Sequence, residues 1–393
     1  MNSELLVIEL FYFSKKKTIN VKEYIEKNSS SLKEEYLNFC ANLENIKLKK
    51  KKLYRLFEIE NNHNLWEMSL IKEKSNLKSD SIYKIIIFLA IKKMINENKV
   101  SKINFYNIPI EENIIKPFMQ SKKIIYNYNH TKFKNEKIKL SLSNIFLFRS
   151  IYYFYLLLVK LFIELRKNKF KDKNSNFLIF SYFAHIKNKK NGKIIFNQFG
   201  NLNILLEKDY ELDTQYIFVP NKINLTSNSL KEHYSLINTN LNFYNKLKII
   251  LKFFHYSFKF FLLKKLIISK LRNSNFFLFT LLSKDYDSSF SGATFIQNLI
   301  WIQVFENYLS KTKKKKCGIF LLENQPWEKA MITSWKNYNH GKIFGYTPTS
   351  INYWHLYNFD YSKKRYATPT KVLVSSNEGF KLLKKQYKKK NTT

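Results

Sequence analysis

Apolar residues in this chain occur in two spacings. Short unbroken runs are typical of buried strands, and stretches with an apolar residue every three or four positions are typical of helices that cover a sheet. In the first third of the chain the two kinds alternate, which predicts an α/β domain over residues 1–135. The predicted strands are 5–13, 53–59, 102–106 and 123–126, and the predicted helices are 21–43, 82–96 and 110–119.

The alternation resumes after a polar stretch at 127–139, our candidate linker. Strands are predicted at 176–182, 216–219, 276–282, 317–322, 342–346 and 371–375, and helices at 202–208, 295–309 and 326–338. We therefore expect parallel sheets with flanking helices throughout. The expected division is an N-terminal domain at 1–135, a linker and apolar cationic helix at 136–175, a second α/β domain at 176–383, and a basic tail at 384–393.

The stretch 316–376 has the clearest order of elements. Two strands with a helix between them form a β-α-β unit, and a third strand follows. Strands connected through a helix lie parallel. Ligands of such sheets bind beyond the carboxyl ends of the strands, and the residues there are Glu323, Thr347 to Ser350, and Ser375.

The start of the 326–338 helix carries its own signals. Pro326 suits the first helical turn, where its missing N–H would have no partner in any case. Asn324 is placed to cap this helix, and Glu328 puts negative charge near its N-terminus.

Two apolar segments with lysines stand apart from this pattern. The longest uncharged run in 143–167 is 150–159, which is too short to cross a bilayer. In 247–268 a polar stripe recurs at helical spacing: Lys248, Lys252, His255 and Lys259. Two interpretations stay open for these helices. They are partly buried against the α/β core, or they lie in the plane of a membrane with lysines on the headgroups.

The composition limits the kinds of partner and cofactor that we expect this chain to bind. The formal net charge is +38, but only five of the basic residues are arginines, the side chain that nucleic-acid recognition favours. We therefore expect solvated lysines and attraction to anionic lipid, with nucleic acid an unlikely partner.

Only 7 glycines are present, and none forms a glycine-rich phosphate loop. Two distant cysteines predict neither disulfides nor zinc, which fits a reducing cytoplasm.

Several polar side chains have both a chemical and a structural interpretation. Glu323 is either a general base for a hydroxyl, which needs a raised pKa, or a carboxylate held by loop N–H groups. Trp327 either packs in the core or stacks on a sugar. Asp285 and Asp287 have the spacing of a metal-binding pair, but we favour turn-forming aspartates and expect no metal. His340 is expected to stabilise a helix C-terminus.

Three patches of the sequence carry a family resemblance. The first is Glu323-Asn324-Gln325-Pro326-Trp327-Glu328-Lys329-Ala330 with His340 to Tyr346 and Tyr353-Trp354, the second is Leu65 to Ser75, and the third is Phe177 to Tyr182 with Gly192 and Asn197 to Leu202. In this order they resemble a family of bacterial surface-carbohydrate (O-antigen type) biosynthesis proteins. Members of that family are regarded as glycosyltransferases with two Rossmann-like domains, the GT-B architecture.

The resemblance implies a site as well as a fold. It implies that Glu323 acts on the acceptor, with substrate contacts from Asn324, Gln325, Trp327, Glu328, Tyr346, Thr347, Thr349 and Ser350. The expected substrates are a nucleotide-sugar donor and a glycan or lipid-linked acceptor. The expected location is the cytoplasm, peripheral on the inner membrane face.

Two departures from the family matter. Thr347-Pro348 stand where the family has a Gln-His pair, and the chain ends at Thr393, where the family continues into a donor-binding domain. We therefore expect the front half of such an enzyme, with a donor domain on a separate chain as one option. A non-catalytic module that docks on membranes or partner enzymes is the alternative function.

Overall fold

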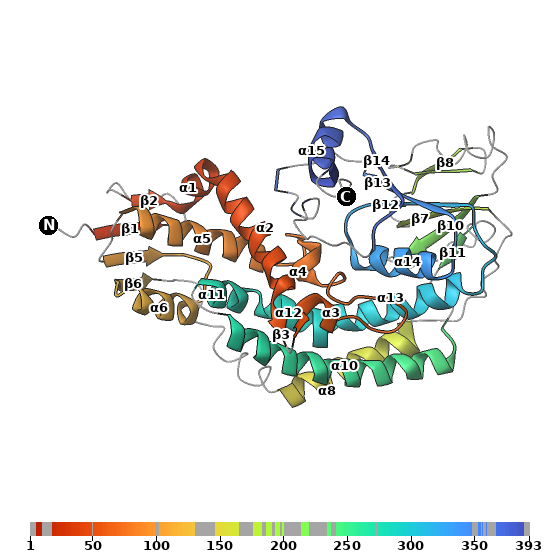
Figure 1. Ribbon diagram of the computed structural model, residues 1–393, viewed down its shortest axis with the longest axis horizontal. Helices are drawn as coiled ribbons and strands as arrows, with labels where there is room; N and C mark the ends of the chain where they lie inside the picture. Colours follow the sequence, from red (N-terminus) through yellow and green to blue (C-terminus); the bar gives the residue numbers. More distant parts are fainter. Residues whose placement is uncertain are drawn as a thin grey trace.

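Two parallel sheets lie at opposite ends of an elongated molecule, with a layer of long helices running beneath both (Figure 1). The computed structural model describes residues 5–9, 18–48, 50–98, 102–129, 146–164, 176–182, 186–190, 193–196, 199, 214–219, 234–236, 241–271, 274–347, 353–354, 356, 359 and 367–388. All strand pairs within both sheets are parallel. The predicted α/β class is therefore confirmed.

The N-terminal sheet has four strands. Their order across the sheet is β2 (Thr18–Asn20), β1 (Leu5–Glu9), β5 (Lys102–Tyr106) and β6 (Ile125–Asn129). The helices that follow these strands are α1 (Val21–Lys27), α2 (Ser29–Asn45), α5 (Ser81–Asn98) and α6 (Glu112–Ser121). The predicted strand at 53–59 is wrong, because these residues form the short helix α3 (Leu53–Leu56) after a small hairpin, β3 (Lys47–Leu48) with β4 (Lys51–Lys52).

The second sheet has six strands in the order β11 (Tyr234–Leu236), β10 (Thr214–Val219), β7 (Phe177–Tyr182), β12 (Cys317–Leu321), β13 (Lys342–Thr347) and β14 (Lys371–Val374). Counted along the chain this order is third, second, first, fourth, fifth, sixth. The direction of strand addition therefore reverses between β7 and β12. A separate antiparallel hairpin pairs β8 (Ile186–Lys190) with β9 (Lys193–Phe196), and the predicted helix at 202–208 lies outside the described residues.

The helical layer consists of α8 (Phe146–Val159) with a π-helical turn (Lys160–Glu164), α10 (Phe243–Lys270), α11 (Ser274–Leu281), α12 (Ser283–Ser291) and α13 (Ala293–Leu309). The predicted strand at 276–282 is wrong, because it is helix α11. A short continuous apolar run does not distinguish a buried strand from a buried helix. None of the helices in the described part of the chain is long and apolar enough to span a membrane.

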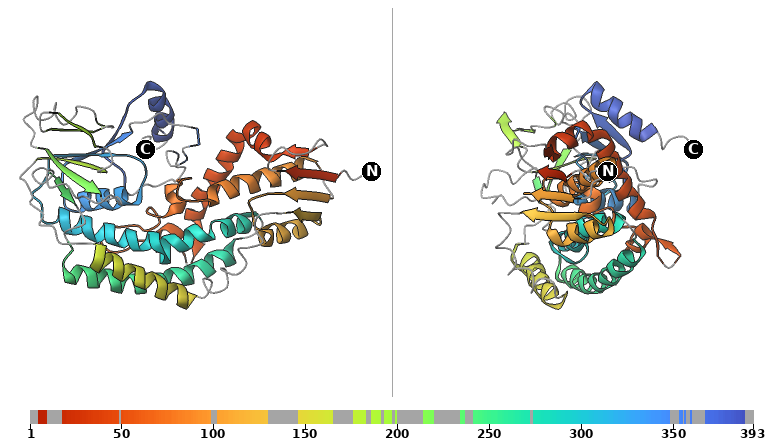
Figure 2. Two further views of the ribbon diagram at one scale, coloured as in Figure 1. Left: turned by 180° about the vertical axis from the view of Figure 1, so that it is seen from behind. Right: turned by 90° about the vertical axis from the view of Figure 1, so that its left-hand side faces the viewer.

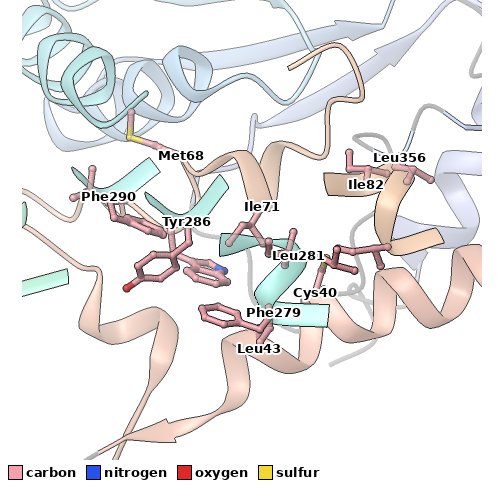
Figure 3. Packing of buried hydrophobic residues seen from close by; sticks show 14 of the residues in the cluster. Cys40, Leu43, Met68, Ile71, Ile82, Phe279, Leu281, Tyr286, Phe290 and Leu356 are labelled. Carbon is pink, nitrogen blue, oxygen red and sulfur yellow. The ribbon is translucent and has the colours of Figure 1, made fainter. Parts of the chain in front are cut away.

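One apolar core joins the N-terminal part to the helical layer. Phe57 and Trp66 stack with Phe260 and Phe290, with ring centroids 4.3–5.9 Å apart. Figure 3 shows Phe279, Tyr286 and Phe290 of α11 and α12 beside residues of α2 and the 65–71 segment. Helices α11 and α12 also contact α5, α6 and α4 (Leu70–Glu73). Part of the predicted second domain therefore packs with the first.

The His340-Gly341 pair fixes the start of β12 beside β13. A Cβ atom on Gly341 would lie 2.0 Å from the carbonyl oxygen of Lys316, so only glycine permits this approach. His340 Nδ1 accepts the N–H of Lys315 at 3.0 Å, and its Nε2–H donates to the carbonyl of Leu309, the last residue of α13, at 3.1 Å. His340 therefore donates a hydrogen bond to a carbonyl group at the C-terminus of α13. Burial lowers its pKa. Because Nδ1 accepts an N–H, that nitrogen carries no proton and the ring is neutral.

Candidate functional site

The carboxyl end of β12 forms a polar corner that we call the Glu323 corner: Glu323, Asn324, Gln325, Glu328 and, from the N-terminal part, Glu73. The strand ends at Leu321, and helix α14 (Pro326–Asn337) begins with Pro326 in its first turn, as predicted. Between them Asn324 has a φ of 60°, a left-handed conformation that asparagine tolerates better than most residues. This turn brings Glu323 back over the start of α14.

Asn324 does not cap α14, contrary to the prediction. The N-cap residue is Gln325, which makes no side-chain capping bond. The left-handed turn aims the Asn324 amide at another segment, where it donates to the carbonyl of Lys72 at 3.0 Å and to that of Glu73 at 3.4 Å. The two sequence patches that carry the family resemblance most clearly therefore meet at this amide.

Glu328 lies behind the corner and is fully buried. Its Oε1 accepts the N–H of Glu323 at 2.9 Å, and its Oε2 has no hydrogen-bond partner among the described residues. Burial raises the pKa of Glu328 to about 8, and the nearby charge of Glu323 adds to this shift. A carboxyl group with this pKa keeps its proton at neutral pH.

Glu73 approaches the same point from α4. Its Oε1 accepts from Lys78 Nζ at 2.6 Å, while its buried Oε2 has no partner in the part of the chain that the structure describes. Burial raises the pKa of Glu73, and the charge of Glu323 acts in the same direction. Three carboxyl groups thus share one corner. Ionising all three together is unfavourable because like charges repel, and this repulsion raises the pKa values of the two buried groups.

Glu323 is the accessible member of the three, because it is only partly buried. Gln325 Nε2 donates to Glu323 Oε2 at 2.6 Å, which orients the carboxylate. An oriented carboxylate beside the protonated Glu328 can accept a proton from a hydroxyl or hydrogen-bond to sugar hydroxyls. A small pocket nearby, lined by Cys40, Glu44, Lys72 and their neighbours, has space for a single water-sized molecule.

The other predicted substrate contacts lie in different surroundings. Trp327 is 2% exposed, and its ring centroid lies 6.3 Å from that of Phe305, so its burial supports packing rather than sugar stacking. The ring of Tyr346 lies 5.7 Å from Phe199. Thr347 is buried, and its hydroxyl has no partner among the described residues. Thr349 and Ser350 lie outside the described residues, as does Pro348.

The aspartate pair at 285 and 287 has structural partners. Both residues lie in α12, so the predicted turn after a strand is wrong. Asp285 accepts from Ser79 Oγ at 2.5 Å, and Asp287 pairs with Lys264 at 2.8 Å. Among the residues that the structure places, no group of three or more histidines, cysteines or acidic residues is arranged to hold a metal.

A second buried carboxylate was not predicted. Glu306 of α13 lies 2.8 Å from His63 Nε2, accepts from Tyr338 at 2.7 Å and from Asn61 at 2.8 Å, and also accepts from Ser334 at 3.0 Å. Burial alone would raise its pKa, but these donors outweigh burial and lower the pKa of Glu306 to about 2. A single carboxylate within the otherwise apolar 295–309 pattern was the available signal. We call this group the Glu306 cluster.

Lys33 makes a third connection between the two parts. Its Nζ donates to the carbonyl of Tyr353 at 2.6 Å and lies 3.4 Å from the ring centroid of Phe359. Burial lowers the pKa of Lys33 to about 8. Together with the Glu306 cluster and the Asn324 amide, this contact positions the N-terminal part against the second sheet.

A scan against protein-family models, a search of curated proteins and a search of solved structures each found no match.

Proposed function

We propose that this chain is a surface-polysaccharide biosynthesis protein of the glycosyltransferase type, and that the Glu323 corner contacts the sugar acceptor. The single observation that carries the proposal is the position of Glu323. It follows β12, one of the two strands between which the strand order of the second sheet reverses. In open α/β sheets, ligands bind beyond the carboxyl ends of the strands at this reversal.

The fold supports the finer, Rossmann-like assignment in two ways. The strand order of the second sheet, third, second, first, fourth, fifth, sixth, is that of nucleotide-binding doubly wound sheets. A second parallel sheet at the other end of the molecule supports the assignment to the N-terminal part of a GT-B-like architecture. The free thiols of Cys40 and Cys317 are compatible with the proposed cytoplasmic location.

The proposed reaction uses Glu323 as a general base. The acceptor hydroxyl gives its proton to the Glu323 carboxylate, its oxygen bonds to the anomeric carbon of a nucleotide sugar, and the bond from that carbon to the diphosphate breaks. The nucleoside diphosphate leaves with the bonding electrons. Gln325 orients the base, and Glu328, which keeps its proton at neutral pH, adds no negative charge beside it.

The test is a transfer assay with a panel of nucleotide sugars and with free and lipid-linked glycan acceptors. We expect Glu323→Gln to lower the transfer rate by at least about a hundredfold, the usual contribution of a general base. Glu26→Gln is the matched control, because Glu26 is an exposed carboxylate on α1. Equal rates for wild type and Glu323→Gln would refute the role of Glu323.

A non-catalytic binding module is the second candidate function. It is favoured by the burial of Trp327 and Glu328, which leaves Glu323 as the most accessible carboxylate of the corner, and by Thr347-Pro348 in place of the family's Gln-His pair. Glycan binding without transfer or nucleotide-sugar hydrolysis by the wild-type chain would establish this function instead.

A further inference from the structure

Helix α10 is apolar on two opposite faces. One face packs against α12 and α13 through buried side chains such as Ile249, Phe253 and Phe260. The opposite face carries exposed apolar side chains spaced by four, three, four and four residues: Leu247, Leu251, Phe254, Phe258 and Leu262. A contiguous exposed apolar row of this length marks an interaction surface.

Helix α8 extends this surface. The rings of Phe154 and Phe254 lie 5.0 Å apart, so these two helices, which are far apart in the sequence, lie side by side. Ile151, Tyr152 and Tyr155 of α8 are each more than half exposed. Both views in Figure 2 place α8 beside α10 on the same side of the molecule. We call this surface the α8–α10 face.

Lysines border the α8–α10 face on one side. Lys248 and Lys252 both pair with Glu60, which neutralises part of their charge. Lys259 lies further along the same side, where burial and the charge of Lys51 lower its pKa. Lys51 belongs to the exposed β3–β4 hairpin, which also carries Lys47 and Lys52. The border of the apolar row is therefore net positive.

We propose that the α8–α10 face binds an anionic lipid bilayer, with both helices parallel to the membrane plane. The apolar rows would enter the boundary between headgroups and acyl chains, and the bordering lysines would meet the negative headgroups. Charge complementarity selects this partner, because apolar side chains with a lysine border fit anionic lipid better than a neutral apolar protein surface.

This orientation constrains the acceptor, a consequence that rests on the proposed function. Helix α13 packs on α10, and α14 packs on α13, so two helix layers separate the membrane from the Glu323 corner. Packed helix axes lie 8–10 Å apart, which puts the corner about 20 Å from the bilayer surface. A lipid-linked acceptor would therefore need an extended glycan to reach Glu323.

The test is co-sedimentation of the full chain with vesicles of phosphatidylcholine alone or mixed with phosphatidylglycerol, at low and high salt. We expect binding to the mixed vesicles that weakens with salt. The double variant Leu251→Glu/Phe258→Glu should bind at least about a hundredfold more weakly. Lys47→Glu/Lys51→Glu should reduce binding about tenfold.

Leu77→Glu is the matched control, because Leu77 is 93% exposed and belongs to neither α8 nor α10; we expect its binding to stay within about twofold of wild type. If the glutamate variants fail to fold, Leu247→Ser/Leu262→Ser replaces them. Glu323→Gln should bind vesicles as wild type does, which separates this proposal from the catalytic one. Absent vesicle binding, unchanged binding by the α10 variants, or a dimer that these variants convert to monomer would each overturn the proposal.

Discussion

The Glu306 cluster and the Glu323 corner both place buried carboxyl groups where the N-terminal part meets the second sheet, yet their electrostatics are opposite. Glu306 is surrounded by donors and has a pKa of about 2. Glu328 accepts an N–H with one oxygen, has no partner for the other among the described residues, and has a pKa of about 8. Glu328 is also buried more completely than Glu306, so fewer donors and deeper burial both favour its neutral form.

This difference in pKa distinguishes a structural carboxyl group from one that is suited to chemistry. A carboxylate with a full set of donors is stable as an anion and has little capacity left to bind a ligand. A buried carboxyl group with few donors, such as Glu328, is poised to exchange its proton near neutral pH, which is typical of functional sites. We therefore interpret the Glu306 cluster as structural, and we propose a functional role only for the Glu323 corner.

The largest expected effect is the loss of the Glu306 carboxylate. Glu306→Ala leaves His63, Tyr338 and Asn61 without their acceptor, and we expect the free energy of unfolding to fall by about 4 kcal/mol. The lowered pKa also predicts acid sensitivity, since this stabilisation is present above the ordinary pKa of 4.5 and is lost as the pH falls toward 2. Urea denaturation at pH 7 measures the first effect, with Glu26→Ala as the control. A change below about 1 kcal/mol would show that the cluster is not structural.

Glu328 should give the opposite pH dependence. Its pKa is raised in the folded chain, so its contribution is favourable below pH 4.5 and is lost as the pH rises through about 8. Glu328→Gln keeps an acceptor for the Glu323 N–H and removes the charge. We expect the variant to be more stable than wild type at pH 9 and to lose most of this advantage at pH 5. Parallel stability curves for the two proteins between these pH values would contradict the assignment.

Asn324 tests whether a neutral contact holds the corner to the N-terminal part. Asn324→Ala loses the hydrogen bond to Lys72 and strains the left-handed backbone, for an expected cost of about 2 kcal/mol. Asn324→Gly fits the backbone and loses only the hydrogen bond, so it should cost about 1 kcal/mol. Thermal unfolding of both variants gives the comparison, and equal costs would mean that backbone strain contributes nothing.

Glu323→Gln has the smallest expected effect on stability, within about 0.5 kcal/mol, because the side chain is only partly buried. The substitution should nevertheless change the pKa values of the neighbouring carboxyl groups. The charge of Glu323 raises the pKa values of Glu328 and Glu73, so its removal should move their titration to lower pH. Unchanged titration of both groups in the variant would show that the three carboxyls do not act together.

Sequence reasoning predicted the β12–α14–β13 unit and the placement of Glu323 at its edge, because strand–helix–strand spacing restricts the strands to a parallel arrangement. It did not predict that Asn324 reaches Lys72, since that contact depends on how distant segments pack. The mistaken strand at 276–282 has a similar cause. An apolar run takes the conformation that its neighbours require, and here α5 and α6 pack against a helix.

The two apolar faces of α10 also show what the sequence pattern can and cannot predict. The lysine spacing of 247–268 predicted a polar stripe, and the structure places Lys248 and Lys252 beside Glu60. Partial burial is confirmed for one face of the helix, and the other face is exposed. The sequence alone does not distinguish these two apolar faces, because both have helical periodicity.

The most direct test of the central claim is a pH titration of the glutamate carboxyl carbons by ¹³C NMR, with the signals of Glu306 and Glu328 assigned through their glutamine variants. Our account predicts that Glu328 titrates near pH 8 in the wild-type chain and at lower pH in Glu323→Gln, while Glu306 stays ionised down to about pH 2. If Glu328 and Glu306 both titrated near the ordinary glutamate pKa, the distinction between a functional corner and a structural cluster would be wrong.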